Sequence, residues 1–134
     1  MAPVTEWPGT LFHFTCQHGR DGIGEAGLCK PLALWNPAAA SRLGDRWELG
    51  VLAWFTDLDT PVAAALGLTR VTISCDRTVF RYRVTDPGNV ERWVGSQWRR
   101  RSVWLRDLER EAGSMPMHWY VAAEPVPVVF DPLR

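Results

Sequence analysis

The stretch LFHFT at residues 11–15, followed by CQHG at residues 16–19, decides how the rest of the chain is interpreted. Its aromatic and β-favouring residues predict a β-strand. Because neighbours in a strand point to opposite faces, His13 shares a face with Leu11 and Thr15, and the two phenylalanines share the other face. A histidine and a hydroxyl backed by apolar rings predict the floor of a ligand cleft. A half-buried histidine that only bonds a neighbouring loop is the alternative.

The length and composition indicate one globular domain, residues 1–134. The chain has 134 residues, of which 46% are hydrophobic, enough for one proper core but not for two domains. No apolar run approaches the roughly 20 residues of a membrane-spanning helix, and the N-terminus lacks the basic and apolar segments of a signal peptide. The three cysteines form no close pair, so a disulfide framework is not expected. We therefore expect a cytoplasmic protein with no membrane partner.

Charge and aromatic content bear on the kind of ligand. The formal net charge is zero, which argues against a general polyanion binder. Lys30 is the only lysine among 15 basic residues, so most fixed cations are planar guanidinium groups that suit phosphate and carboxylate. Since the chain has eight tryptophans, we expect some in the core and some in a cleft that stacks flat rings.

The hydrophobic pattern predicts an α+β chain of about six strands and two or three short helices. The strands are expected at 10–15, 51–56, 69–74, 79–84, 117–122 and 126–130. Leu32–Trp35 also fits a short strand, and residues 86–89 fit a tight turn.

Three segments are expected to be helical. Residues 18–28 contain several glycines, so only a short helix with a cap at Gly27 is predicted. Thr60 suits an N-cap and Pro61 suits the first position of a helix with its body at 62–66 and its end at Gly67. Residues 103–110 predict an amphipathic helix that ends near Gly113. Residues 37–43 fit a helical turn or a loop.

Residues that could carry chemistry are spread over three of these strands. The first holds His13 and Thr15, the second holds the run WFTD at 54–57, and the third holds HWY at 118–120 and leads to Glu124. His13, Cys16 and His18 are close enough in the sequence to suggest zinc ligands. No second paired motif supplies the fourth ligand, which Cys29, Cys75 or His118 could provide only through the fold, so no metal site is expected.

This ordered series resembles the ADP-ribosyltransferase superfamily, most nearly its small histidine–tyrosine–glutamate members. The resemblance covers about the first two thirds of the chain. Its elements are the FHFT opening strand, a short helix ending in Gly27-Leu28, the strand at 54–56, and a Val-x-x-Ser-x-Asp hairpin at 71–76 that leads into RYRV at 81–84.

The resemblance implies a fold and a reaction. The fold is a split core of two small antiparallel sheets with short flanking helices, which grips NAD between the sheets. The reaction is transfer of ADP-ribose from NAD to a macromolecular acceptor, protein or nucleic acid, with release of nicotinamide. Breaking the nicotinamide–ribose bond builds positive charge on the sugar, which a nearby carboxylate stabilises.

The resemblance also implies roles for particular residues. His13 would bond a ribose of NAD, and Thr15 would hold the adenosine side. Trp54 or Phe55 would stack on nicotinamide in place of the family's tyrosine. Thr56, next in the same strand, is counted with the cofactor-binding residues. Glu124 falls at the end of the third strand, where it would supply the carboxylate. His118, at the start of that strand, is a second catalytic candidate from its place in the sequence and not from the resemblance, and a packing or hydrogen-bonding histidine is the alternative.

The remaining charged residues are assigned on chemistry alone. An arginine fork can neutralise the NAD pyrophosphate, and Arg20 and Arg81 are the candidates, with Arg83 as an alternative to Arg81. Each also fits an ordinary surface arginine. Glu109 and Glu111 lie on the predicted amphipathic helix and are expected to be solvated.

A rival interpretation keeps the fold and drops the catalysis. The chain would then be a non-catalytic interaction or nucleic-acid-binding module. Its working surface would be Trp98 with Arg99, Arg100 and Arg101, because interleaved aromatic rings and guanidinium groups can stack on bases and pair with phosphates. A solvated helix face explains the same residues equally well.

Overall fold

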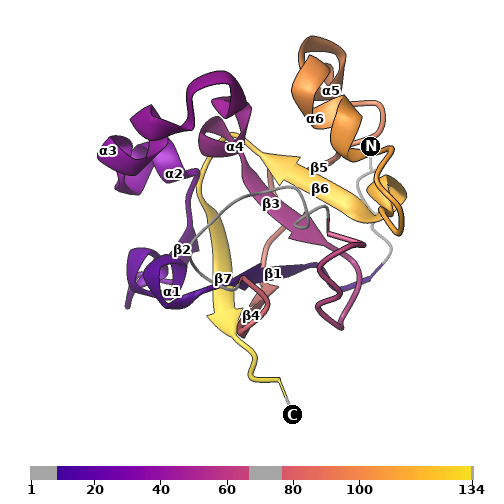
Figure 1. Cartoon of the computed structure of the whole chain (residues 1–134). Coiled ribbons are helices and arrows are strands. Elements are labelled where there is room, and N and C mark those ends of the chain that lie inside the picture. The colour runs from indigo at the N-terminus through magenta and orange to yellow at the C-terminus, as the bar shows by residue number, and fades with distance from the viewer. Residues whose placement is uncertain (1–8, 67–76, 134) are drawn as a thin grey trace.

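The computed structural model describes residues 9–66 and 77–133, and these form a mixed α+β structure (Figure 1). One curled antiparallel sheet of seven strands carries the fold, and short helices flank it. This agrees with the predicted class. The strands form one continuous sheet, whereas two separate small sheets were expected.

The seven strands are short, and their order in the sheet differs from their order in the chain. The sheet order is β2-β7-β4-β1-β3-β6-β5. The strands are β1 (Phe12–Thr15), β2 (Leu28–Cys29), β3 (Ala53–Thr56), β4 (Phe80–Val84), β5 (Glu91–Arg92), β6 (Trp119–Ala122) and β7 (Val126–Phe130).

The helices are also short, and they lie in two groups at different places on the sheet (Figure 1). The first group comprises α1 (Gln17–Ile23), α2 (Leu32–Trp35), α3 (Pro37–Ala40), the 3₁₀ segment η2 (Ser41–Arg46) and α4 (Glu48–Val51). The second comprises α5 (Gln97–Arg101), α6 (Val103–Leu108) and the 3₁₀ turn η4 (Pro116–His118). No helix within the described ranges combines the length and apolar character needed to cross a membrane.

The junction between β1 and β3 is the weakest point of the sheet. β1 pairs with β4 through four residue pairs, and β3 pairs with β6 through four. β1 and β3 share only one pair, Phe12 opposite Thr56. Beyond that pair, a side-chain hydrogen bond replaces backbone pairing between the two strands: His13 Nδ1 bonds the Trp54 carbonyl oxygen at 2.7 Å. The two strands therefore diverge toward Thr15 and leave a notch in the sheet.

The curl of the sheet encloses the main core. β6 and β7 are joined by residues 123–125 only, although three strands separate them in the sheet, so the sheet must bend back on itself. Apolar side chains from the inner face fill the bend, and burying them drives the curl. They include Leu11, Phe55, Tyr82, Val84, Tyr120, Ala122, Val126 and Val128.

A second core lies on the opposite face of β3 and β6, beneath α5 and α6. Its centre is Trp93, which is completely buried. Around it pack Leu52, Leu105, Leu108, Trp119 and Val121, with Trp54 and Trp98 at the margin. Many of the tryptophans thus serve packing, as expected for part of the set.

Three predicted elements in the first half differ in the structure. Leu32–Trp35 is the helix α2 and not a strand, because Pro31 precedes it and the Asn36 side chain caps the next helix by accepting from Ala39 N. The strand expected at 51–56 begins at Ala53, since Val51 still belongs to α4. Residues 62–66 form one turn only, closed by Leu66 N on the Val62 carbonyl oxygen.

Later elements also end earlier or start later than predicted. The amphipathic helix stops at Leu108, and looser turns continue to Gly113, whose φ is 84°. The strand expected at 117–122 begins at Trp119, because Pro116 starts the turn η4. The predicted strand at 69–74 and the helix end at Gly67 lie outside the described residues.

Candidate functional site

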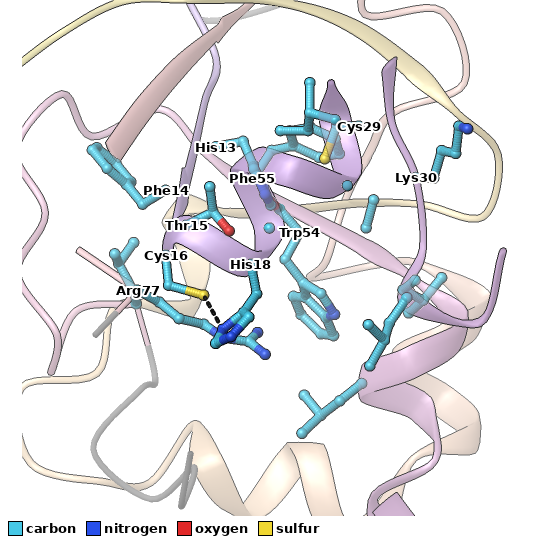
Figure 2. Close-up of a pocket in the computed structure, with 18 of the residues that line it drawn as sticks. His13, Phe14, Thr15, Cys16, His18, Cys29, Lys30, Trp54, Phe55 and Arg77 are labelled. Atoms are coloured by element: carbon cyan, nitrogen blue, oxygen red, sulfur yellow. Dashed lines mark hydrogen bonds between the residues drawn. The ribbon is translucent and has the colours of Figure 1, made fainter. Parts of the chain in front are cut away.

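A cavity of about 550 Å³ opens where β1 and β3 diverge (Figure 2). Its walls come from β1, β3, α1, α6 and the helical segment from α2 to α4. The lining residues include Phe12, His13, Phe14, Thr15, Cys16, His18, Cys29, Lys30, Trp35, Asn36, Arg42, Trp54, Phe55, Thr56, Arg77 and Trp119. The volume lies within the range of small-molecule sites.

The structure brings five of the predicted cofactor-binding residues together in this cavity: His13, Thr15, Trp54, Phe55 and Thr56. The Phe55 ring centroid lies 5.6 Å from that of His13. The Trp54 indole packs on Trp93, with ring centroids 5.2 Å apart. The cavity wall therefore has an imidazole from β1 and two aromatic side chains from β3.

The His13 ring is held neutral and oriented by its surroundings. Burial, with a smaller effect of the positive charge of Arg77, lowers the pKa of His13 to about 4, although the bond to the Trp54 carbonyl oxygen favours protonation. A neutral ring that bonds a carbonyl oxygen through Nδ1 must carry its proton there. Its Nε2 is then a hydrogen-bond acceptor.

The two threonines of the site, Thr15 and Thr56, make packing and hydrogen-bond contacts within the fold. Thr15 is buried, and its side chain lies against the backbone of Gly19 in α1. A Cβ at residue 19 would be 1.8 Å from Thr15 Oγ1, so only glycine lets α1 pack this close to β1. Thr56 Oγ1 accepts a hydrogen bond from Leu58 N at 3.1 Å, which fixes the turn after β3. Both hydroxyl groups therefore shape the cavity walls.

Three cationic side chains that were not predicted from the sequence as site residues line the cavity. They are Lys30, Arg42 and Arg77, and no aspartate or glutamate appears among the lining residues in the described ranges. Arg77 follows the predicted hairpin motif, but nothing in its spacing distinguishes it from a solvated loop arginine. A cavity wall whose described charged side chains are all cations favours an anionic ligand.

Two buried N–H donors of the cavity have no partner within the described residues. They are the indole Nε1 of Trp54 and the Nε of Arg77. Buried donors in proteins are nearly always paired, because an unpaired one costs about 1–3 kcal/mol. Their placement in one cavity indicates room for the acceptor atoms of a ligand.

The two arginines predicted to meet pyrophosphate lie elsewhere. Arg20, on α1, places its guanidinium carbon 4.8 Å from the Phe80 ring centroid and 4.4 Å from that of Phe130. Arg81 donates to the Asp59 carbonyl oxygen at 2.9 Å and pairs with Asp131 at 3.2 Å. Neither lines the cavity. Arg81 instead ties β4 to the C-terminal segment.

Glu124 and His118, the predicted catalytic residues, are separated by the full length of β6. Glu124 follows the strand in an exposed turn, where its Oε1 accepts from Asn89 Nδ2 at 3.4 Å. His118 precedes the strand, and its Nδ1 bonds Asp57 Oδ1 at 2.5 Å. Neither residue lines the cavity. The structure thus does not bring this pair together or place it beside His13.

His118 belongs to a separate cluster with Asp57 and Tyr120. The second oxygen of Asp57 accepts from the Tyr120 hydroxyl at 3.1 Å. Burial and the Asp57 charge together raise the pKa of Tyr120 to about 12, so the phenol keeps its proton and donates. This cluster joins the end of β3 to the start of β6.

The rival surface at Trp98–Arg101 is only partly available. Arg99 forms a two-bond ion pair with Glu109, with Nε to Oε2 at 2.7 Å and Nη2 to Oε1 at 2.9 Å. Trp93 Nε1 also donates to Glu109, at 2.6 Å. The expectation that Glu109 is solvated is therefore wrong: its side chain is 13% exposed.

The remaining two arginines of that surface are exposed. The Arg101 guanidinium carbon lies 5.7 Å from the Trp98 ring centroid, a cation–π contact.

Burial alone would raise the pKa of Glu109, but the hydrogen bonds from Arg99 and Trp93 outweigh this effect of burial and hold that pKa below its usual value.

Within the described residues, no group of three or more His, Cys, Asp or Glu side chains is placed to hold a metal ion. Comparison with known proteins adds no assignment: no family model matched the chain, and neither curated proteins nor solved structures gave a significant match.

Proposed function

We propose that this chain is an ADP-ribosyltransferase-like domain that binds NAD in the cavity between β1 and β3. The observation that carries the proposal is the cavity itself. It combines aromatic rings, cations and orphan N–H donors, and no carboxylate appears among its described lining residues. NAD and ADP-ribose offer matching parts, since both have flat rings, hydroxyl groups and a diphosphate. The one-pair junction of β1 and β3 supports the proposal, because it opens the single sheet where the ligand is proposed to bind.

Each group of the cavity has a role in this proposal. Arg77 and Arg42 neutralise the diphosphate through charge-assisted hydrogen bonds. Trp54 or Phe55, which point to opposite faces of β3, packs against a flat ring. Neutral His13, with its proton on Nδ1, accepts a hydrogen bond from a ribose hydroxyl at Nε2. The diphosphate contact comes from Arg77 in place of Arg20 and Arg81, which are engaged elsewhere.

The proposed reaction is transfer of ADP-ribose from NAD to a protein or nucleic-acid acceptor, with nicotinamide released. The proposed carboxylate, Glu124, would have to reach the sugar from its exposed turn. A second candidate function is binding of the nucleotide without turnover. The observation that favours it is the lack of a carboxylate among the described residues of the cavity wall.

A thermal-shift titration with NAD, ADP-ribose and nicotinamide tests the binding. A ligand at 100 times its Kd adds about 2.7 kcal/mol of stability, which raises Tm by several degrees in a domain of this size. We expect a shift with ADP-ribose and NAD in the wild type and a smaller one in His13→Ala. No shift at millimolar concentration would contradict the proposal.

Nicotinamide release, followed by chromatography, separates the two candidate functions. Under the transferase hypothesis, the wild type releases nicotinamide. The Glu124→Gln variant still binds NAD but releases no nicotinamide. Binding of NAD with no release by either protein, in the presence of a crude protein and RNA mixture as acceptor, would favour the non-catalytic function.

A further inference from the structure

A cysteine and a histidine form a close pair in the wall of the cavity. Cys16 lies directly after β1 and His18 lies in the first turn of α1. The Cys16 Sγ is 3.8 Å from His18 Nδ1, and Figure 2 shows this contact at the side of the pocket. Cys16 is only 5% exposed, yet it lines the cavity. A small molecule inside the cavity can therefore meet the thiol.

The charged side chains around this pair are cationic in the part of the cavity wall that the structure describes. The titratable side chains that line the same cavity are His13, His18, Lys30, Arg42 and Arg77, with Cys29, and no carboxylate is among them in the described ranges. The positive charge of Arg77 is felt inside the cavity, because it disfavours protonation of His13. Cysteines become nucleophilic in such electropositive, partly accessible surroundings, and an adjacent imidazole can take the thiol proton.

Cys29 provides a contrast within the same molecule. It lies in the same cavity wall and, like Cys16, is almost completely buried, but it packs in the main core, whereas Cys16 contacts the His18 imidazole. Burial raises the pKa of the Cys29 thiol far above its usual value. A buried thiol of this kind stays protonated and inert. The third cysteine of the chain, Cys75, lies outside the described residues.

We propose that Cys16 is a nucleophilic thiol, with His18 as its base, and that it reacts with ligands that present an electrophilic carbon inside the cavity. In the reaction with an alkyl halide, His18 takes the thiol proton and the sulfur forms a bond to carbon. The carbon–halogen bond breaks, and the halide leaves with its electron pair. The orphan N–H donors of Trp54 and Arg77 mark space in the same cavity for the polar part of such a ligand.

Iodoacetamide labelling of the folded protein, mapped by peptide mass spectrometry, tests the proposal. At pH 7 we expect Cys16 to react at least about tenfold faster than Cys29, since the rate follows the thiolate fraction. His18→Gln should slow Cys16 by about tenfold at pH 7, and the difference should vanish at high pH, where the thiol ionises without help. Cys29→Ser is the matched control and should label at Cys16 as the wild type does. His18 is exposed, so His18→Gln should fold normally, which circular dichroism verifies.

Two results would overturn the proposal: Cys16 labelling no faster than Cys29, or a Cys16 rate that His18→Gln leaves unchanged at every pH. The proposal does not depend on NAD. Adding ADP-ribose separates the two hypotheses in one experiment. Fast labelling that ADP-ribose slows supports both. Fast labelling that ADP-ribose does not slow supports the thiol and contradicts ADP-ribose binding in this cavity.

Discussion

The neutral His13 ring gives the fold a specific dependence on pH. Its pKa falls from 6.5 to about 4 on folding, mainly because the ring is buried. Between pH 6.5 and pH 4, His13 is therefore mostly protonated in the unfolded chain and mostly neutral in the folded chain. The stability from the neutral ring is fully present above pH 6.5 and is lost as the pH falls toward 4. One pKa unit corresponds to about 1.4 kcal/mol, so the loss is about 2 kcal/mol at pH 5 and about 3 kcal/mol at pH 4.

Urea unfolding of the wild type and His13→Asn at pH 8 and pH 5 measures this effect. Asparagine keeps an N–H donor for the Trp54 carbonyl oxygen but does not titrate. The wild type should lose about 2 kcal/mol more than His13→Asn between the two pH values. Equal losses in the wild type and His13→Asn would refute the reasoning.

Three further substitutions test the packing around the site. Glu109→Gln removes the charge that two buried or half-buried N–H donors share, so it should lower the free energy of unfolding by about 2 kcal/mol at pH 7 in urea. Because the Glu109 pKa is lowered on folding, this difference should shrink below about pH 4. Gly19→Ala puts a Cβ 1.8 Å from Thr15 Oγ1 and should cost about 1–3 kcal/mol in thermal unfolding, with Thr15→Ala restoring part of the loss. Arg81→Met should speed amide hydrogen exchange at Asp131, whose N–H bonds the Arg81 carbonyl oxygen, without changing the ligand-induced Tm shift.

Local sequence signals predicted the elements whose side-chain pattern is self-contained. The FHFT run forms β1, and His13 and Thr15 share the face that meets Phe55 and the cavity. The turn at 86–89 is also as predicted, with Gly88 N on the Asp86 carboxylate and Val90 N on the Pro87 carbonyl oxygen. In both places, neighbours in the chain decide the conformation.

Errors occurred where the apolar pattern alone fits two structures, or where distant parts of the chain decide the outcome. The short apolar run at 32–35 fits a strand or a helix equally by pattern, and only its flanking Pro31 and Asn36 make it a helix. Arg77 was missed and Arg81 was favoured because no pattern shows which loop arginine the curled sheet carries into the cavity. Glu109 was expected in solvent because its partners, Trp93 and Arg99, are brought to it by β5 and α5.

The central claim is that the cavity between β1 and β3 binds the ADP-ribose part of NAD, with Arg77 on the diphosphate. Titration calorimetry of ADP-ribose against the wild type, Arg77→Gln and Arg83→Gln tests it most directly. Arg83 is an exposed arginine of β4 outside the cavity and provides the matched control. We predict binding by the wild type and Arg83→Gln, and a Kd at least about tenfold weaker for Arg77→Gln, since a charge-assisted hydrogen bond contributes about 1.5–3 kcal/mol. No binding by the wild type, or equal binding by Arg77→Gln, would contradict it.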